Sequence, residues 1–282
     1  MTTLIWNPDV FVMGQTQFDA DGLESWMQLN ALEQHMLPDA GSPLSALWAD
    51  VNDDFALERM IEFGGRHCYR SWAEGRDRHA YIRNIIEMEH GSVLEHSSLN
   101  LAIQGVSRSL SHELVRHRVG VAISQESQRY VDAKDIKFVV PPLVSYVAGG
   151  AFTVGTGGSI DRFITECEIA RAAYQRLQES LIEQLVAKSP NVKSLTMVKK
   201  RANEAARAHL PNAAETRFLW SPNMRLLRHF LWLRGGSGAD LEIRRLAVLL
   251  LDIAKSKAPA IFADMTTSPG EYGVPVIVSA ES

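Results

Sequence analysis

Apolar side chains recur along most of the chain with the spacing of helices, and in one segment with the spacing of a strand. A period near 3.6 residues lines up apolar side chains on one helix face, whereas a period of two lines them up on one face of a strand. Helical spacing predicts helices over residues 21–36, 55–69, 78–89, 106–118, 160–188, 192–209, 222–234 and 239–257. The Gly64-Gly65 pair marks a potential interruption of the second of these helices.

Strand patterns are fewer. Leu99, Leu101 and Ile103 alternate with polar or small residues, which predicts a half-buried strand over residues 97–106. Residues 127–142 are expected to form a strand with a turn, stopped by Pro141 and Pro142. The overall pattern predicts an α+β fold, in which a small mixed or antiparallel sheet is surrounded by helices.

Two segments interrupt the periodic pattern. Residues 38–43, PDAGSP, read as a break between helices. Residues 147–159, VAGGAFTVGTGGS, are rich in glycine and small side chains, and the segment from Gly149 to Gly158 is interpreted as a mobile surface loop and the best candidate for a lid.

Composition restricts the class of protein. The chain of 282 residues, with 46% hydrophobic and 22% charged residues, is long enough for a buried core of one large or two small domains. The net charge of −4 provides no global attraction for nucleic acid, so any anion site must be local. Two cysteines outside any CxxC pair argue for a reducing, cytoplasmic location. The first residues lack a signal-peptide pattern, and no apolar run reaches the length of a membrane span.

Residues 116–130, RHRVGVAISQESQRY, collect hydrogen-bond donors around a short apolar insert. Arginine offers a rigid fork of donors that matches phosphate, so the stretch is a candidate site for a phosphate-bearing ligand. The plainer interpretation is a helix end that is solvated or paired with Glu113 or Glu126. A nucleic-acid stripe would need more basic residues on one face.

Residues 90–96, HGSVLEH, hold two histidines and a glutamate. Zinc sites on one helix favour histidines four residues apart, but these are six apart across Gly91, which disfavours a metal. A polar ligand site and a plain helix-to-strand connection both remain open.

The segment from Arg207 to Arg234 places arginines among aromatic side chains. Such a helical face is more often core and surface than a cofactor site. A helix beginning at Pro222-Asn223 would nevertheless direct free N–H groups at an anion. The glycine-rich dinucleotide, P-loop and GxSxG patterns are absent from the sequence.

Taken together and in this order, the three segments resemble the flavin-dependent (alternative) thymidylate synthases, over residues 61–258. The resemblance implies the alternative thymidylate synthase fold, a homotetramer with shared active sites, and bound FAD. It further implies methylation of dUMP to dTMP, with a one-carbon unit from methylenetetrahydrofolate and with NADPH as the reductant. It divides the chain into an N-terminal extension packed on the core (1–50), the synthase domain (51–260) and a C-terminal tail (261–282).

The resemblance also assigns residues. The expected flavin contacts are His90, Ser92, Glu95, Arg116, His117, Arg118, Asn223 and His229. The expected nucleotide contacts are Glu113, Gln125, Glu126, Ser127, Gln128, Arg129, Arg207 and Arg234. Arg234 and Ser127 are the expected catalytic residues, with Arg234 polarising the pyrimidine. Neither Cys68 nor Cys167 stands in the setting of a thiolate nucleophile, so the expected mechanism needs none, and no metal is expected.

The chain departs from the family pattern at three places. Eight residues rather than seven separate Arg118 from Ser127. Glu113 stands where glutamine is frequent, and Gly238 and Asp240 replace a histidine and a glutamine. These differences keep two alternatives open: a hydroxymethylase of the same fold acting on dUMP or dCMP, and a non-catalytic nucleotide- or RNA-binding module.

Overall fold

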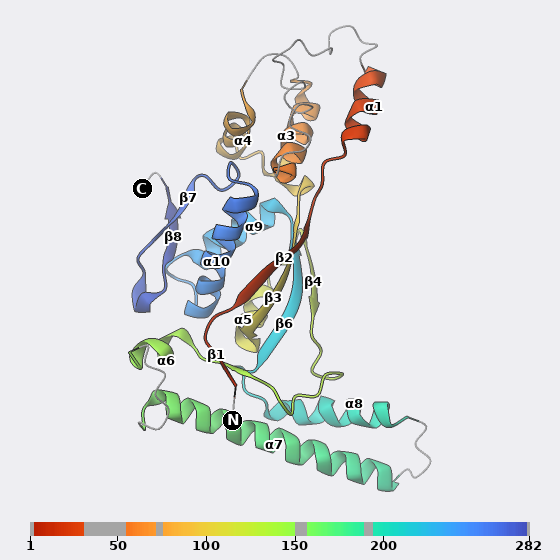
Figure 1. Cartoon of the computed structure of the whole chain (residues 1–282), viewed down its shortest axis with the longest axis vertical. Coiled ribbons are helices and arrows are strands. Elements are labelled where there is room, and N and C mark those ends of the chain that lie inside the picture. The colour runs from red at the N-terminus through yellow and green to blue at the C-terminus, as the bar shows by residue number, and fades with distance from the viewer. Residues whose placement is uncertain (1–2, 31–54, 72–75, 150–156, 189–193, 281–282) are drawn as a thin grey trace.

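The computed structural model describes residues 3–30, 55–71, 76–149, 157–188 and 194–280. Its centre is a four-stranded antiparallel sheet in the order β2-β3-β6-β4, formed by β2 (Asp9–Gln15), β3 (Leu99–Ser107), β6 (Glu215–Pro222) and β4 (Val121–Gln125). Figure 1 shows α9 (Met224–Gly235) and α10 (Leu241–Lys257) on one side of this sheet, together with the short α5 (Arg108–Leu114).

The other helices lie at the two ends of the sheet (Figure 1). At one end are α1 (Ala20–Asn30), α3 (Ala56–Tyr69) and α4 (Arg78–Glu87), followed by the 3₁₀ helix η1 (Gly91–His96). At the opposite end, α7 (Ser159–Lys188) lies beside α8 (Leu195–Ala206), which leads into η2 (Arg207–His209). The short α6 (Pro142–Val147) precedes α7.

The core forms where the sheet meets α9 and α10. Ile103 and Phe218 are paired across β3 and β6, as are Leu101 and Trp220, and all four side chains are buried. The Trp220 ring lies 5.0 Å from the ring of Phe230 on α9, centroid to centroid. Burial of such aromatic and branched side chains is the main favourable term in folding, so this contact fixes α9 on the sheet.

The two terminal segments also contact this core. The edge strand β2 pairs with β3, and β1 (Leu4–Ile5) pairs in parallel with β5 (Phe138–Val139). At the other terminus, β7 (Met265–Ser268) and β8 (Val276–Ser279) form a hairpin around η3 (Glu271–Gly273). The division of the chain at residues 50 and 260 remains a prediction.

Two charged side chains hold this hairpin to α9. Asp264 accepts two hydrogen bonds from the guanidinium of Arg228, from Nη1 and from Nη2, both at 2.8 Å. Arg228 is buried and also donates to the carbonyl of Ile261. Burial by itself would raise the pKa of Asp264, but the hydrogen bond and the charge of Arg228 outweigh it and lower that pKa.

The predicted α+β class is confirmed, and so are the helices near 55–69, 78–89, 160–188, 222–234 and 239–257 and the strand near 97–106. Helix 21–36 is confirmed as far as Asn30, and α8 begins within the predicted range 192–209. Residues 31–36, the break at 38–43 and most of the proposed lid lie outside the described residues.

Three expectations were wrong. Helix α3 runs through Gly64 and Gly65 without interruption. The glycines are explained by close packing, because an added Cβ would lie 2.9 Å from the His96 ring at Gly64 and 2.8 Å from the Tyr81 hydroxyl at Gly65. Residues 215–222 form the strand β6, not part of a helical face. Between 127 and 142, only Phe138 and Val139 form a strand, since the preceding residues turn.

Among the described residues, no helix is both long enough and apolar enough to cross a membrane.

We predict that Asp264→Ala lowers the free energy of unfolding by about 2 kcal/mol, because Arg228 keeps its burial but loses its charged partner. This value is kept small because the Asp264 side chain is partly exposed, and solvent weakens the ion pair. Because the folded-state pKa of Asp264 is lowered, its contribution is complete above the unfolded pKa and is lost as the pH falls below about 4. Chemical denaturation at neutral and acidic pH measures both effects. Asp252→Ala, at an exposed position on α10, is the control and should change little.

Candidate active site

Three segments far apart in the sequence meet at the N-terminus of α9. Asn223 caps this helix, since its side-chain Oδ1 accepts a hydrogen bond from the Leu226 N–H at 2.8 Å. The Asn223 N–H donates to the carbonyl of Gly120, and the Met224 N–H donates to the carbonyl of Ser97. The histidine-containing segment 90–96 and the turn after Arg116-His117-Arg118, which we call the arginine-rich turn, are thereby fixed around one helix end.

The turn requires a glycine. Gly120 has a φ of +77°, a conformation that side chains disfavour. A Cβ at Gly120 would lie 2.4 Å from the side-chain nitrogen of Asn223, so this close approach also excludes a larger residue. Beyond the turn, β4 pairs with β6 from Val121↔Pro222 to Gln125↔Phe218 in an unbroken register. The apolar insert is therefore an ordered strand, and its pairing with β6 contains no bulge.

The side chains around this helix end provide many donors. Arg116 and Arg118 are exposed beside the turn, and Arg225 in the first turn of α9 forms an ion pair with Glu95. His90 stacks on Tyr69 with ring centroids 5.8 Å apart, and Ser92 is exposed on η1. Guanidinium groups beside the positive end of a helix dipole suit a pyrophosphate, so these residues fit the phosphates of a flavin dinucleotide.

His117 lies away from this exposed group of arginines. It is buried, its ring is 5.2 Å from that of Phe230 and 6.0 Å from that of His229, and its Nε2 accepts a hydrogen bond from Nε of Arg234 at 3.0 Å. Burial lowers the pKa of His117, and the charges of Arg234 and His229 lower it further. The imidazole is therefore neutral at pH 7, and the accepting Nε2 places its proton on Nδ1.

Arg234 also forms an ion pair with Glu113. Nη1 of Arg234 donates to Oε2 of Glu113 at 2.8 Å. Burial raises the pKa of Glu113, the charge of Arg234 opposes that rise, and the nearby carboxylate of Asp240 adds to it. Arg234, Glu113 and His117 form one network that joins α9 to the end of α5, and we call it the Arg234 network.

The expected nucleotide residues Gln125 to Arg129 lie at the other end of β4. The Gln125 amide donates to Oγ1 of Thr216 at 3.0 Å, and the Ser127 carbonyl accepts from the N–H groups of Tyr130 and Val131. Arg129 pairs with Glu204 on α8, with Nε 3.4 Å from Oε2. Among the described residues of one chain, no hydrogen bond or ion pair connects this segment to the Arg234 network.

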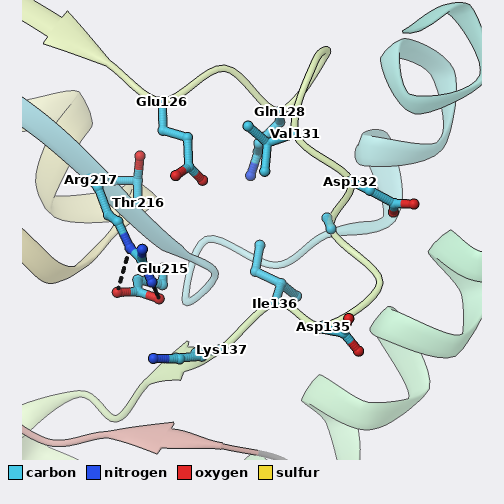
Figure 2. Close-up of a pocket in the computed structure, with 11 residues that line it drawn as sticks. Glu126, Gln128, Val131, Asp132, Asp135, Ile136, Lys137, Glu215, Thr216 and Arg217 are labelled. Carbon is cyan, nitrogen blue, oxygen red and sulfur yellow. Dashed lines mark hydrogen bonds and ion pairs between the residues drawn. The ribbon is translucent and has the colours of Figure 1, made fainter. Parts of the chain in front are cut away.

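A cavity of about 170 Å³ lies below this segment (Figure 2). Glu126 directs its carboxylate toward the centre of the labelled group, whereas Asp132 and Asp135 point away from it (Figure 2). Arg217 lies at the side and pairs with Glu215 of the same strand, with Nε 3.4 Å from Oε1. The cavity therefore lies between the candidate nucleotide segment and the central strand β6.

The sequence analysis missed Arg108. This side chain donates to Oγ1 of Thr216 at 3.3 Å, beside Gln125. Burial lowers the pKa of Arg108, and the nearby cation of Arg207 lowers it further, while Glu126 opposes the shift. Two arginines that repel each other are suited to share an anion such as a phosphate. The signal in the sequence was a cation directly after the cap Ser107, where the helix dipole disfavours it.

The described residues contain no group of three or more histidine, cysteine, aspartate or glutamate side chains arranged to hold a metal ion.

Comparison with known proteins gives a consistent result. Residues 52–260 match the Thy1 family, described as thymidylate synthase complementing protein. A flavin-dependent thymidylate synthase from Mycobacterium sp. (strain JLS) is 43% identical over 221 residues, which cover 77% of this chain and 83% of that protein. The flavin-dependent thymidylate synthase of Mycobacterium tuberculosis (strain ATCC 25177 / H37Ra) is 42% identical over 225 residues, 78% of this chain and 84% of that protein.

A solved structure shares the fold. The UMP/dUMP methylase PolB from Streptomyces cacaoi, bound with 5-Br UMP, aligns with a TM-score of 0.59 and 18% identity, over 93% of this chain and 95% of that one. The matched family covers η1, the arginine-rich turn, the Arg234 network and α9, so the chain belongs to the Thy1 family, with flavin-dependent thymidylate synthases among its relatives.

Proposed function

We propose that this protein is a flavin-dependent thymidylate synthase, which methylates C5 of dUMP with a one-carbon unit from methylenetetrahydrofolate. Bound FAD, once reduced by NADPH, would supply the hydride that completes the methyl group. The observation that carries the proposal is the meeting of η1, the arginine-rich turn and the Arg234 network around α9, in a chain about 42% identical to enzymes of that name.

The roles of the chain's own residues follow from this geometry. Arg116, Arg118 and the N-terminus of α9 bind the flavin phosphates. Arg108 and Arg207 bind the nucleotide phosphate, and Arg234 donates to a pyrimidine carbonyl. A cation at that carbonyl stabilises negative charge on the ring as C5 attacks the methylene carbon and later loses its proton.

The two cysteines support a mechanism without a protein thiolate. Cys167 is buried in α7, and burial raises the pKa of its thiol to about 11, so that it stays protonated at neutral pH. Cys68 lies on α3, outside the Arg234 network and outside the segment from Gln125 to Arg129.

One observation keeps hydroxymethylation as the second candidate. The position of Gly238 is open, with no heavy atom within 4 Å of an added Cβ, where many relatives would place a ring. Water with access to the transferred carbon would yield a hydroxymethyl instead of a methyl group.

We propose that the working enzyme is a homotetramer, in which a second subunit brings the nucleotide segment and the Arg234 network into one site.

Incubation with dUMP, methylenetetrahydrofolate and NADPH is predicted to convert dUMP into dTMP, with a flavin absorbance spectrum on the purified or FAD-supplemented protein. Mass spectrometry of the nucleotide distinguishes the added methyl group from a hydroxymethyl group, and dCMP is tested in parallel. A hydroxymethyl product would favour the second candidate. A protein that binds no flavin would instead favour a non-catalytic nucleotide- or RNA-binding module.

Arg234→Ala is predicted to lower kcat by about 100-fold or more while FAD stays bound, since removal of one preorganised donor costs roughly 3 kcal/mol of transition-state stabilisation. Steady-state kinetics and flavin absorbance measure the two effects. Arg176→Ala, at an exposed position on α7, is the matched control. Normal turnover of the Arg234 variant would contradict the assigned role.

Arg108→Ala is predicted to raise the KM for dUMP by about tenfold to 100-fold with a smaller effect on kcat, because a charge-assisted hydrogen bond to phosphate contributes about 1.5–3 kcal/mol. Titration with deoxyuridine, which has no phosphate, should show little difference between this variant and the unchanged protein. An equal loss for both ligands would assign Arg108 a role away from the phosphate.

A further inference from the structure

A cluster of buried polar side chains joins helices α7 and α8 beside the nucleotide segment, Gln125 to Arg129. Gln178 on α7 and Asn203 on α8 are 7% and 3% exposed, and Nε2 of Gln178 donates to Oδ1 of Asn203 at 2.7 Å. Tyr174, one helical turn before Gln178, is fully buried, and its hydroxyl lies 3.1 Å from the same Nε2. Polar groups at such depth need their hydrogen bonds, so each member sets the orientation of the others.

The cluster also holds the chain that follows the nucleotide segment. Oδ1 of Asp132 accepts hydrogen bonds from the Tyr174 hydroxyl at 3.2 Å and from Nε2 of Gln178 at 3.0 Å. The same oxygen accepts from the Lys134 N–H, and the Tyr174 hydroxyl accepts from the Ala133 N–H at 3.1 Å. Burial raises the pKa of Tyr174 to about 12, so its hydroxyl keeps the proton that it donates to Asp132. These contacts explain why Asp132 points away from the cavity (Figure 2).

Arg129 itself is held by α8 through both its main chain and its side chain. Nδ2 of Asn203 donates to the Arg129 carbonyl in a long hydrogen bond of 3.4 Å. The guanidinium pairs with Glu204, the next residue of α8, whose Oε2 lies 3.4 Å from Nε. Because Gln178 binds the Oδ1 end of the Asn203 amide, the direction of the donor to Arg129 depends on Gln178.

Gln178 lies where the buried face of α7 would otherwise be apolar. That face carries Ile160, Cys167 and Tyr174 before Gln178, at helical spacing. An apolar side chain would also suit burial at this position, since a typical intramolecular hydrogen bond adds only about 1 kcal/mol to stability. The direction that the amide imposes on its partners is the property that an apolar residue could not supply.

We propose that Gln178 is a positioning residue for the nucleotide, because it orients Asn203 and Asp132 and thereby holds the nucleotide segment in its binding conformation before the ligand arrives. The proposal rests on the proposed function, which supplies the nucleotide. A segment that is already ordered loses less conformational freedom on binding, so its ligand binds more tightly. Loss of the Gln178 amide should therefore weaken nucleotide binding and leave the chemical step nearly unchanged.

Gln178→Leu keeps a similar volume but removes the donors to Asn203 and Asp132. The dissociation constant of dUMP is measured by calorimetry on the flavin-loaded protein without folate, and KM and kcat are measured in the complete reaction. We expect dUMP to bind about tenfold more weakly and its KM to rise about as much, with kcat within about twofold and FAD affinity unchanged. Gln184→Leu, at an exposed position of the same helix, is the control and should match the unchanged protein.

Hydrogen exchange of the backbone amides distinguishes positioning from a general loss of stability. In Gln178→Leu without dUMP, residues 127–134 should exchange faster than in the unchanged protein, and saturating dUMP should remove most of the difference. The strands β3 and β6 should exchange at nearly the same rate in both proteins.

A double-mutant cycle with Asn203→Ala tests the route from Gln178 to Arg129. The two changes together should weaken dUMP binding by much less than the product of their separate effects, because both interrupt the same connection.

Unchanged affinity for dUMP in Gln178→Leu would overturn the proposal, whether or not the melting temperature falls, and so would full additivity with Asn203→Ala. Where Gln178→Leu does not fold, Gln178→Met, which is unbranched like glutamine, takes its place. Failure of both variants to fold would assign Gln178 a structural role and overturn the proposal. The proposed function fails separately, when the unchanged protein binds dUMP but makes no dTMP, whatever the Gln178 variants show in binding.

Discussion

The pairing of β6 with its two neighbours is the constraint on which the site depends. This central strand buries Phe218 and Trp220 toward α9 and pairs with β3 on one side and β4 on the other. It ends at Pro222, where Asn223 begins α9. The direction of one strand therefore sets the position of the helix that carries Arg225, His229 and Arg234. The residues that contact the start of this helix, Ser97 and Gly120, precede the neighbouring strands β3 and β4.

The local balance of charge is the second constraint. A chain of net charge −4 has no general attraction for anions, so its cations must be concentrated where ligands bind. The structure does this in two ways. Arg108 lies near the cation of Arg207, whose repulsion Glu126 opposes, whereas Arg234 is paired directly with Glu113. The first arrangement suits a phosphate of fixed charge, and the second holds a guanidinium in place through two partners.

The helices were predictable because their apolar spacing is long and regular, and three separated motifs were enough to identify the family. The strand β6 was missed, although Thr216, Phe218 and Trp220 alternate toward the core. The arginines and aromatic residues of this segment also fit the spacing of a helical face, so the period of two was not recognised. The helix through Gly64 and Gly65 could not be predicted from local propensity, because the contacts with His96 and Tyr81 that require glycine come from other elements. Arg108 was missed for a related reason, since only the fold brings it to Arg207.

The register of β4 determines which side chains between Arg118 and Ser127 face the core. An insertion within β4 would shift every later side chain to the opposite face of the sheet, since side chains alternate along a strand. The five residue pairs of β4 with β6 follow one another without a shift, so Gln125 keeps its place opposite Phe218 and beside Thr216. The turn at Gly120 has a positive φ, and its carbonyl accepts a hydrogen bond from the backbone N–H of Asn223. The cap of α9 and the register of β4 thus fix the two ends of the apolar insert independently, and with them the donors on either side.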